Sequence, residues 1–276
     1  MTAGSFGEYL RARREQVTPE QAGLKPPGRR RVRGLRRDEV ARLAGISAEY
    51  YTRLEQGHDR HPSAQVLDSL ARALSLDPPA ARYLRGLARP PGPRGSRPPE
   101  RVSPTVLRLL GALPLHPAFV QGRYMDVLAA NELMTALSPV LYRPGASILR
   151  AAFLEHAVEG LFADPDERLA NAVAGLRALA GPDGGDPRLA ELIGDLSAGS
   201  AVFRDLWSRH DVRPMTSGGT HRLRHPQAGD LELRYDKFLV TGADRQTLVV
   251  YQADPGSPSE RALRSLAELT RAAGPG

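Results

Sequence analysis

The stretch from Leu35 to Gly57, LRRDEVARLAGISAEYYTRLEQG, predicts two short helices joined by a turn. Val40 and Leu43 lie three residues apart, so they share one face of the first helix. Gly45 supplies the positive φ with which the chain leaves that helix, and Ser47 is a favourable N-cap for the second. A helix, a three-residue turn and a second helix form the smallest device that places a helix in the major groove of DNA.

The second helix of this pair has one inward face and one outward face. Tyr51 and Leu54 are spaced to point into a core. An amphipathic hairpin without a DNA-binding role would show the same periodicity, but it would not require Ala, Gly, Ile and Ser at these offsets beside a basic segment. The pattern therefore favours DNA binding. The candidates for contacts with base edges or phosphates are Ser47, Ala48, Glu49, Tyr50, Thr52 and Arg53.

Charge is distributed unevenly along the 276 residues, although the formal net charge is only +7. Residues 1–100 contain 19 basic and 11 acidic side chains, whereas residues 101–276 contain 19 and 20. The whole basic excess therefore lies in the half that carries the two-helix unit. This distribution predicts a polyanionic partner for that half and a different role for the other.

A basic arm, Lys25–Gly34 with the sequence KPPGRRRVRG, immediately precedes the two-helix unit. Its two prolines, two glycines and five basic residues predict an extended segment that contacts phosphates. Entry into the minor groove and a solvated basic loop are the alternatives. Arg60, just beyond the second helix, is placed to reach the DNA backbone. The expected phosphate contacts in the arm are Arg29, Arg30, Arg31 and Arg33.

Three regions follow from the pattern of helical periodicity and of proline and glycine. Helical stripes continue to about residue 88, so residues 1–88 are predicted to form an all-α domain. Residues 89–101, rich in proline, glycine and arginine, read as a linker. Residues 102–276 are long enough for a second domain of typical size.

The second region combines strands and helices. Short apolar runs at 117–120 and 125–129 predict two early strands, and several helical stripes follow them. Alternation at 231–236 and the run TLVVY at 247–251 predict two late strands. We therefore expect an α+β domain whose sheet is covered by helices on one face.

Composition excludes several classes of site. The chain contains no cysteine, which excludes disulfides, cysteine-ligated zinc, iron–sulfur clusters and thiol catalysis. No stretch approaches the ~20 apolar residues that span a bilayer, and the first residues lack the apolar core of a secretory signal. We expect a cytoplasmic, nucleoid-associated protein without a membrane partner.

An enzyme with a DNA-binding head is the main alternative class. The sequence contains no G-x-S-x-G, no P-loop and no G-x-G-x-x-G motif. His221 and His225 lie four apart, but in a β-like segment where this spacing does not create a helical face. His58 and His61 have no third type of metal ligand nearby. We therefore predict that the protein is not an enzyme and holds neither a metal nor a cofactor.

Several segments together resemble one family. The first 90 residues are similar to lambda-repressor-like (XRE) helix-turn-helix domains. A narrower combination, spanning residues 5–270, resembles the MmyB-like transcriptional regulators. The segments that carry the narrower resemblance are PPGRRRVRGLRRDEVARLAGIS, AEYYTRLEQGHDRHPSAQVLDSLARAL, LPLHPAFV, MDVLAANELMTAL, FRDLWSRHDV, GDLELRYDKF and TLVVYQADPGSPS.

The resemblance implies a dimeric repressor or activator, and we expect a homodimer that binds an inverted repeat in double-stranded DNA. It makes residues 102–276 a PAS-like, ligand-sensing and dimerisation domain for a fatty acid or similar apolar molecule. It also implies that Arg37 contacts phosphate and that Ala48, Glu49 and Arg53 face bases. Arg53, which can donate two hydrogen bonds to guanine, is the best candidate for direct readout.

Within the helix-turn-helix unit, the chain departs from the family pattern at two places. Arg36 stands where Ser or Thr usually caps the first helix of the motif, so a cap is lost. Ala48 and Glu49 stand where Gln is common. Alanine contacts only a thymine methyl, and glutamate only accepts, for instance from a cytosine amino group.

A ligand pocket between the sheet and the helices is predicted in the second region. Plain core packing is the alternative for each of its residues. An antitoxin-like DNA-binding protein, with an interaction module in place of a ligand domain, is the alternative function. The predicted pocket residues are Phe119, Leu128, Phe153, Phe162, Trp207, Leu233 and Tyr251.

Overall fold

The computed structural model describes residues 6–24, 33–59, 61–88, 99–180, 186–213, 218–243 and 245–273. The chain divides into two compact units. The first comprises Met1–Ser96 and Val173–Pro214, and the second comprises Arg97–Ala172 and Met215–Gly276. The sequence predicted an uninterrupted second domain over 102–276. In the structure, Val173–Pro214 groups with the first unit, so packing divides the chain differently from this predicted boundary.

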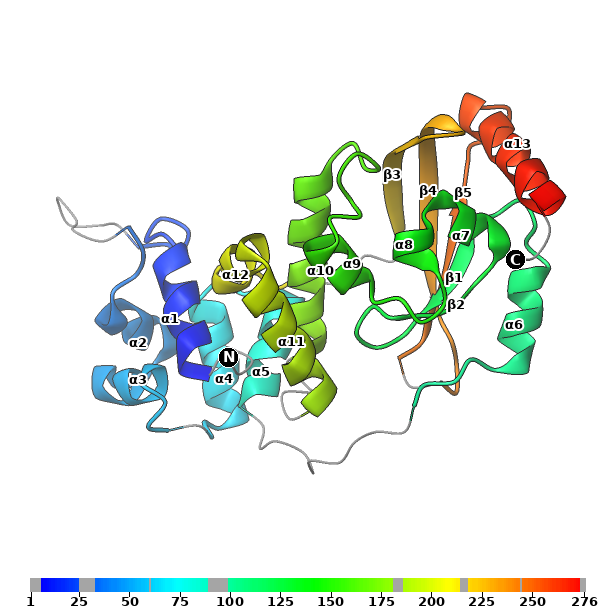
Figure 1. Cartoon of the computed structure of the whole chain (residues 1–276). Helices are drawn as coiled ribbons and strands as arrows, with labels where there is room; N and C mark the ends of the chain where they lie inside the picture. Colours follow the sequence, from blue (N-terminus) through cyan, green and yellow to red (C-terminus); the bar gives the residue numbers. More distant parts are fainter. Residues whose placement is uncertain are drawn as a thin grey trace. The chain divides into compact units, whose positions relative to one another are not determined.

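The described part of the first unit is built from helices. Oxygens of Ser47, Ser63 and Asp77 accept hydrogen bonds from backbone N–H groups at the starts of three of them, as N-caps do. Helix α10 (Pro165–Ala180) contributes its second half. The other helices, blue to cyan and yellow in Figure 1, are α1 (Phe6–Gln16), α2 (Arg37–Ala44), α3 (Ala48–Glu55), α4 (Ala64–Ala73), α5 (Pro78–Leu87), α11 (Pro187–Gly199) and α12 (Ala201–Ser208).

One apolar core holds the first unit together. Leu10, Tyr51 and Leu70 are among its fully buried side chains. Ala178 of α10 and Val212, just after α12, pack into the same core. Burial of apolar surface is the dominant favourable term in folding. The shared core therefore holds Val173–Pro214 against the early helices.

Arg177 of α10 is completely buried in this unit. Its guanidinium donates hydrogen bonds to Tyr83 Oη at 3.3 Å and to the Trp207 carbonyl oxygen. It also lies 3.8 Å from the centroid of the Trp207 ring and 3.3 Å from His210 Nδ1. These four residues form the Arg177 network, which joins α5 to α10 and α12 and gives the physical reason for the altered boundary.

Gly7 marks a close approach between α1 and the end of α3. A Cβ atom added at Gly7 would overlap the backbone carbonyl of Glu55. We expect Gly7→Ala to lower the free energy of unfolding by about 1–3 kcal/mol, because the two helices must move apart. Urea denaturation followed by circular dichroism measures this loss.

Gly194 provides the matched control for that substitution. It lies inside α11, in the same unit, and a Cβ atom there would have nothing within 4 Å. Gly194→Ala should stabilise the protein by up to about 1 kcal/mol, since alanine is the better helix former. If both variants shifted the unfolding midpoint in the same direction, the close approach at Gly7 would be refuted.

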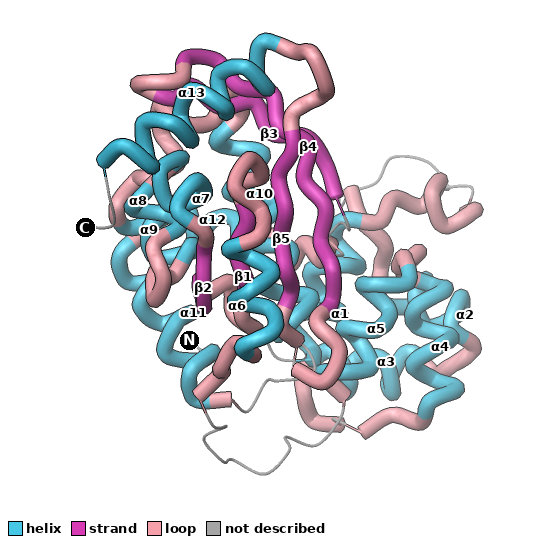
Figure 2. The backbone as a smooth tube through the Cα atoms, turned by 90° about the vertical axis from the view of Figure 1, so that its right-hand side faces the viewer, coloured by secondary structure: helices cyan, strands magenta, loops and turns pink. Residues whose placement is uncertain are grey.

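The second unit contains one antiparallel sheet with the strand order β2-β1-β5-β4-β3, magenta in Figure 2. This confirms the predicted α+β class and the early and late strands. The strands are β1 (Ala118–Gln121), β2 (Val127–Ala130), β3 (Gly218–His225), β4 (Gly229–Leu239) and β5 (Thr247–Gln252). The helices are α6 (Pro104–Gly111), α7 (Glu132–Leu137), α8 (Pro139–Tyr142), α9 (Ile148–Leu154), α13 (Pro258–Ala273) and the first half of α10.

Helices cover both faces of the sheet, so the expectation of a single covered face was wrong. Leu110 of α6 packs with Val120 and Leu248. Phe119 points to the opposite face, because side chains alternate along a strand, and its ring centroid lies 5.1 Å from that of Tyr142 in α8. All four residues of β1 are buried, as expected for a strand enclosed on both sides.

Candidate DNA interface

The turn between α2 and α3 has the predicted geometry. Gly45 adopts φ 69° and ψ 32°, and its N–H bonds back to carbonyl groups of α2. Ile46 packs against the core of the first unit. Ser47 Oγ accepts a hydrogen bond from the Tyr50 N–H at 3.1 Å and so caps α3. The three-residue turn therefore sets the angle between the two helices through left-handed backbone and a side-chain cap.

Helix α2 buries a stripe made of Val40, Ala41 and Ala44. Leu43 was expected to share the inward face with Val40, but it lies at the edge of the stripe and is 36% exposed. The missing Ser or Thr cap is compensated from inside the helix, because the Arg36 N–H donates to Glu39 Oε2 at 2.7 Å. This contact is the reverse half of a capping box.

Helix α3 presents fewer open side chains than its periodicity predicted. Ala48, Glu49 and Arg53 are exposed, as expected. Tyr50 is half-buried against the core, and the Thr52 hydroxyl donates to the Ala48 carbonyl at 2.8 Å. The outward surface of α3 is therefore centred on Ala48, Glu49 and Arg53, while Tyr50 and Thr52 flank it.

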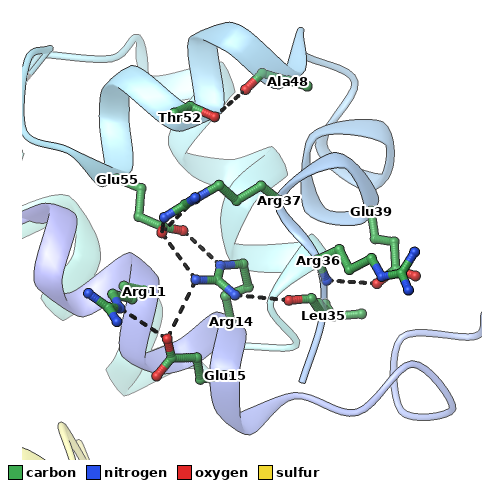
Figure 3. A network of polar contacts seen from close by, with 10 residues as sticks. All are labelled: Arg11, Arg14, Glu15, Leu35, Arg36, Arg37, Glu39, Ala48, Thr52 and Glu55. Atoms are coloured by element: carbon green, nitrogen blue, oxygen red, sulfur yellow. Dashed lines mark hydrogen bonds and ion pairs between the residues drawn. The ribbon is translucent and has the colours of Figure 1, made fainter. Parts of the chain in front are cut away.

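Glu55 is the centre of a polar network at the end of α3 (Figure 3). Its side chain is 2% exposed and accepts from Arg14 Nε at 2.7 Å and from Arg37 Nη2 at 2.8 Å. Arg14 also donates to the Leu35 carbonyl at 3.0 Å. Three segments are thus tied together by one carboxylate: α1, the start of α2 and α3.

The charge state of Glu55 follows from its partners. Burial alone would raise the pKa of the Glu55 carboxyl, but hydrogen bonds from Arg14 and Arg37 outweigh burial and lower the pKa below its usual value. Glu55 therefore remains ionised and holds the half-exposed guanidinium of Arg37 in one position. Since Glu55 uses only part of the five donors of a guanidinium, Arg37 keeps donors for a phosphate.

The structure describes the arm only at its C-terminal end. Arg33 is exposed. A Cβ atom at Gly34 would come within 2.6 Å of the Arg14 carbonyl oxygen, and the Leu35 N–H donates to that same oxygen at 2.9 Å. The end of the arm is therefore fixed against α1. The predicted contacts Arg29, Arg30, Arg31 and Arg60 lie outside the described residues.

The predicted ligand pocket is brought together only in part. The side chains of Phe119, Leu233 and Tyr251 share one face of the sheet through the register of β1, β5 and β4. Phe162 pairs with Leu223 in an isolated β-bridge beside β3, and its ring centroid lies 5.6 Å from that of His221. Phe153 is buried in α9 of the same unit.

Two predicted pocket residues lie elsewhere. Leu128 packs on the cluster beneath α6, and Trp207 belongs to the first unit, stacked on Phe203 and beside Arg177. Helical periodicity placed Trp207 on an apolar face without showing which core receives that face. A cavity of about 490 Å³ in the second unit is lined by none of the predicted residues; its wall includes Glu100, Arg101, Arg123 and Gln246.

Comparison with known families separates the two halves of the chain. A sequence model described as the MmyB-like transcription regulator ligand binding domain matches residues 102–266, which is more than half of the chain. A second, described as a helix-turn-helix domain, matches residues 5–84. Both are regulatory domains and neither is an enzyme. No curated protein matches the chain. None of the described helices has the length and apolarity needed to cross a bilayer.

Proposed function

The chain belongs to the MmyB-like transcription regulators, and from this membership we propose that it is a homodimer that binds an inverted-repeat operator under the control of an apolar small molecule such as a fatty acid. The geometry of α2 and α3 carries the DNA-binding part of the proposal. A capped helix with Ala48, Glu49 and Arg53 exposed on one side is suited to a major groove. Such a protein would act at chromosomal DNA in the cytoplasm.

Affinity and sequence specificity would come from two different classes of contact. Arg37 and the basic residues of the arm, including Arg33, would contact phosphates, which position the protein but carry no sequence information. Arg53 would contact a base edge. If a dimer neutralises on the order of ten phosphates, the logarithm of the binding constant should fall with the logarithm of salt concentration with a slope near −9. A slope of about −2 would contradict the proposed set of phosphate contacts.

Arg53→Ala tests the base contact directly. We expect the variant to lose about 1–3 kcal/mol of binding free energy and to relax specificity at one base pair per half-site. Arg33→Ala is the matched control and should weaken binding to all sequences alike. Both variants are compared by gel shift against a library of operators selected from genomic fragments. Identical effects across the library would show that the two roles are wrongly assigned.

The ligand changes DNA affinity only if it binds two conformational states of the dimer with different affinities. A molecule that binds two arrangements equally cannot shift DNA affinity, however tightly it binds. Native mass spectrometry of freshly purified protein should therefore reveal a co-purified apolar molecule whose removal changes operator affinity. If no such molecule is found and fatty acids produce no thermal shift, the second unit is a dimerisation scaffold.

A further inference from the structure

Lysine is rare in this chain. Of its 38 basic residues only Lys25 and Lys237 are lysines, and the others are arginines. The two types differ chemically, because arginine keeps its proton in proteins whereas a buried lysine loses it readily and then acts as a nucleophile. Lys25 belongs to the basic arm and lies outside the described residues. Lys237 lies within β4, so the structure gives its surroundings.

Lys237 stands on the face of the sheet opposite α6. It pairs in register with Val249 of β5, and Val249 pairs with Phe119 of β1. Paired residues share a face, so Lys237 continues a row that contains two buried apolar side chains. Lys237 itself is half-buried. Its amine is therefore partly desolvated but still within reach of a small molecule.

No carboxylate compensates the charge of Lys237 within the part of the chain that the structure describes. The acidic residues of β4 are Asp230, Glu232 and Asp236, which alternate with Lys237 and so lie on the other face of the sheet. The neighbour of the Lys237 Nζ atom is instead the ring of Tyr235, whose centroid is 5.6 Å away. A desolvated ammonium group without a counter-charge is costly.

A second cation acts on the same face. Arg168, in the first turn of α10, places its guanidinium 3.9 Å from the centroid of the Phe162 ring and donates to His221 Nε2 at 2.7 Å. The His221 ring stacks on Tyr235, with centroids 4.4 Å apart. The rings of His221 and Tyr235 thus link the guanidinium to the surroundings of Lys237, and they exclude water there.

Burial, and then the charge of Arg168, lower the pKa of Lys237 to about 8. At pH 7.5 roughly a quarter of Lys237 is then neutral, compared with about one in a thousand for an ordinary lysine. The pKa of His221 is lowered to about 2 by the same two causes, so His221 is neutral and adds no charge. A lysine that is desolvated beside another cation is an activated nucleophile.

We propose that Lys237 is a site of covalent attachment for aldehydes. Its Nζ atom forms a bond to the carbonyl carbon and gives a carbinolamine. The former carbonyl oxygen then leaves as water together with the two protons of the neutral amine, and the product is an imine. The step needs neither an oxidant nor a reductant. The inference concerns a reversible covalent bond and is independent of the DNA binding and of the non-covalent ligand proposed above.

The test exposes the full-length protein briefly to hexanal and quenches the reaction with sodium borohydride, which reduces imines to stable amines. Peptide mass spectrometry then measures alkylation at each amine separately. At pH 7.5 we expect Lys237 to be alkylated at least about 10-fold more than Lys25, because far more of Lys237 is neutral. The N-terminal amino group, whose usual pKa is about 8, shows that the reagent is active. Equal alkylation of Lys237 and Lys25, or none at Lys237, would overturn the proposal.

The pH dependence of alkylation has a definite sign. Alkylation of Lys237 should rise with pH and level off above about 8, whereas alkylation of Lys25 should continue to rise toward pH 10. A Lys237 profile parallel to that of Lys25 would contradict the proposal. The charged or titratable groups on this side of the sheet are Arg168 of α10, His221 of β3, Tyr235 of β4, Tyr251 of β5 and Tyr142 of α8.

Two variants assign the reactivity to the surroundings of Lys237. Arg168→Met removes the neighbouring charge, so it should reduce alkylation of Lys237 at pH 7.5 several-fold and move the pH profile upward. Arg222→Met is the matched control, because Arg222 alternates with His221 along β3 and is paired with Asp164 at 2.7 Å, and it should leave alkylation unchanged. Equal alkylation in the two variants would refute the role of Arg168.

Unfolding provides a control that does not depend on any variant. In guanidinium chloride the two lysines should be alkylated alike, because neither burial nor Arg168 then acts on Lys237. A preference for Lys237 that survived unfolding would show that the fold is not its cause and would overturn the proposal. If Arg168→Met fails to fold, the wild-type pH profile and this control decide the outcome.

Discussion

Replacing Glu55 with alanine is expected to lower the free energy of unfolding by about 3–5 kcal/mol, because it leaves a buried cation without its partner. Arg14 is 11% exposed and directs two nitrogens at the Glu55 carboxylate. Arg37 loses the same partner, but it is half-exposed and water can solvate it. Most of the loss should therefore come from Arg14. Urea denaturation followed by circular dichroism measures the effect.

Glu15→Ala is the control for that substitution. Glu15 is 54% exposed; it pairs with Arg11 one helical turn away and, at 3.6 Å, with Arg14. Because these are exposed contacts of Glu15, its removal should cost no more than about 0.5 kcal/mol. If Glu55→Ala were as mild as Glu15→Ala, the carboxylate would not hold the three segments together. In DNA binding, Glu55→Ala should also weaken all operators alike, because Arg37 is no longer held in place.

The same carboxylate predicts how stability responds to acid. The pKa of Glu55 is lowered in the folded protein. Its contribution is therefore fully present above the usual carboxyl pKa and is lost as the pH falls through the lowered value. Glu55→Gln should remove this part of the acid sensitivity, so the stability curves of the wild type and the variant should converge at low pH. Parallel curves would contradict the assignment.

Arg177→Ala is the second substitution with a large expected effect, about 3–5 kcal/mol. The change leaves a cavity beside Trp207 and removes the donors that serve Tyr83 Oη and the Trp207 carbonyl. Arg177→Met fills most of the volume and should isolate the hydrogen-bond part, about 1–3 kcal/mol. Trp207 is the single tryptophan of the chain and is 3% exposed, so its fluorescence reports directly on this region.

The fluorescence of Trp207 also shows how the first unit comes apart. In Arg177→Ala we expect the fluorescence transition to occur at lower urea concentration than the circular dichroism transition, because α10 to α12 separate before the early helices unfold. Arg209→Ala is the control, since Arg209 is 53% exposed and pairs with Asp205 one turn away. If Arg177→Ala and Arg209→Ala had the same fluorescence midpoint, the Arg177 network would not be what holds α10 to α12 against the early helices.

Local chemistry predicted the helix-turn-helix and most of the element order. Gly45 and Ser47 affect only residues close to them in the sequence, through a left-handed backbone conformation and a cap hydrogen bond. Their effect can therefore be read from a short stretch of sequence. Ser63 and Ser103 cap α4 and α6 by the same kind of local hydrogen bond, and the alternation in β4 is likewise visible over a few residues. Exposure of Ala48, Glu49 and Arg53 was predicted correctly, and their contacts with DNA stay predictions.

Contacts between residues far apart in the sequence were decided by tertiary packing, and a short stretch of sequence cannot show them. Arg14 and Glu55 are 41 residues apart and Arg177 and Tyr83 are 94 apart, and no spacing rule joins such pairs. The stripe that contains Trp207 was recognised as apolar, but which core buries an apolar stripe depends on what packs against it. The contact between Arg168 and His221 likewise exists only because β3 and the start of α10 meet. Caps and periodicity act between neighbours in the sequence, whereas burial is a property of the assembled fold.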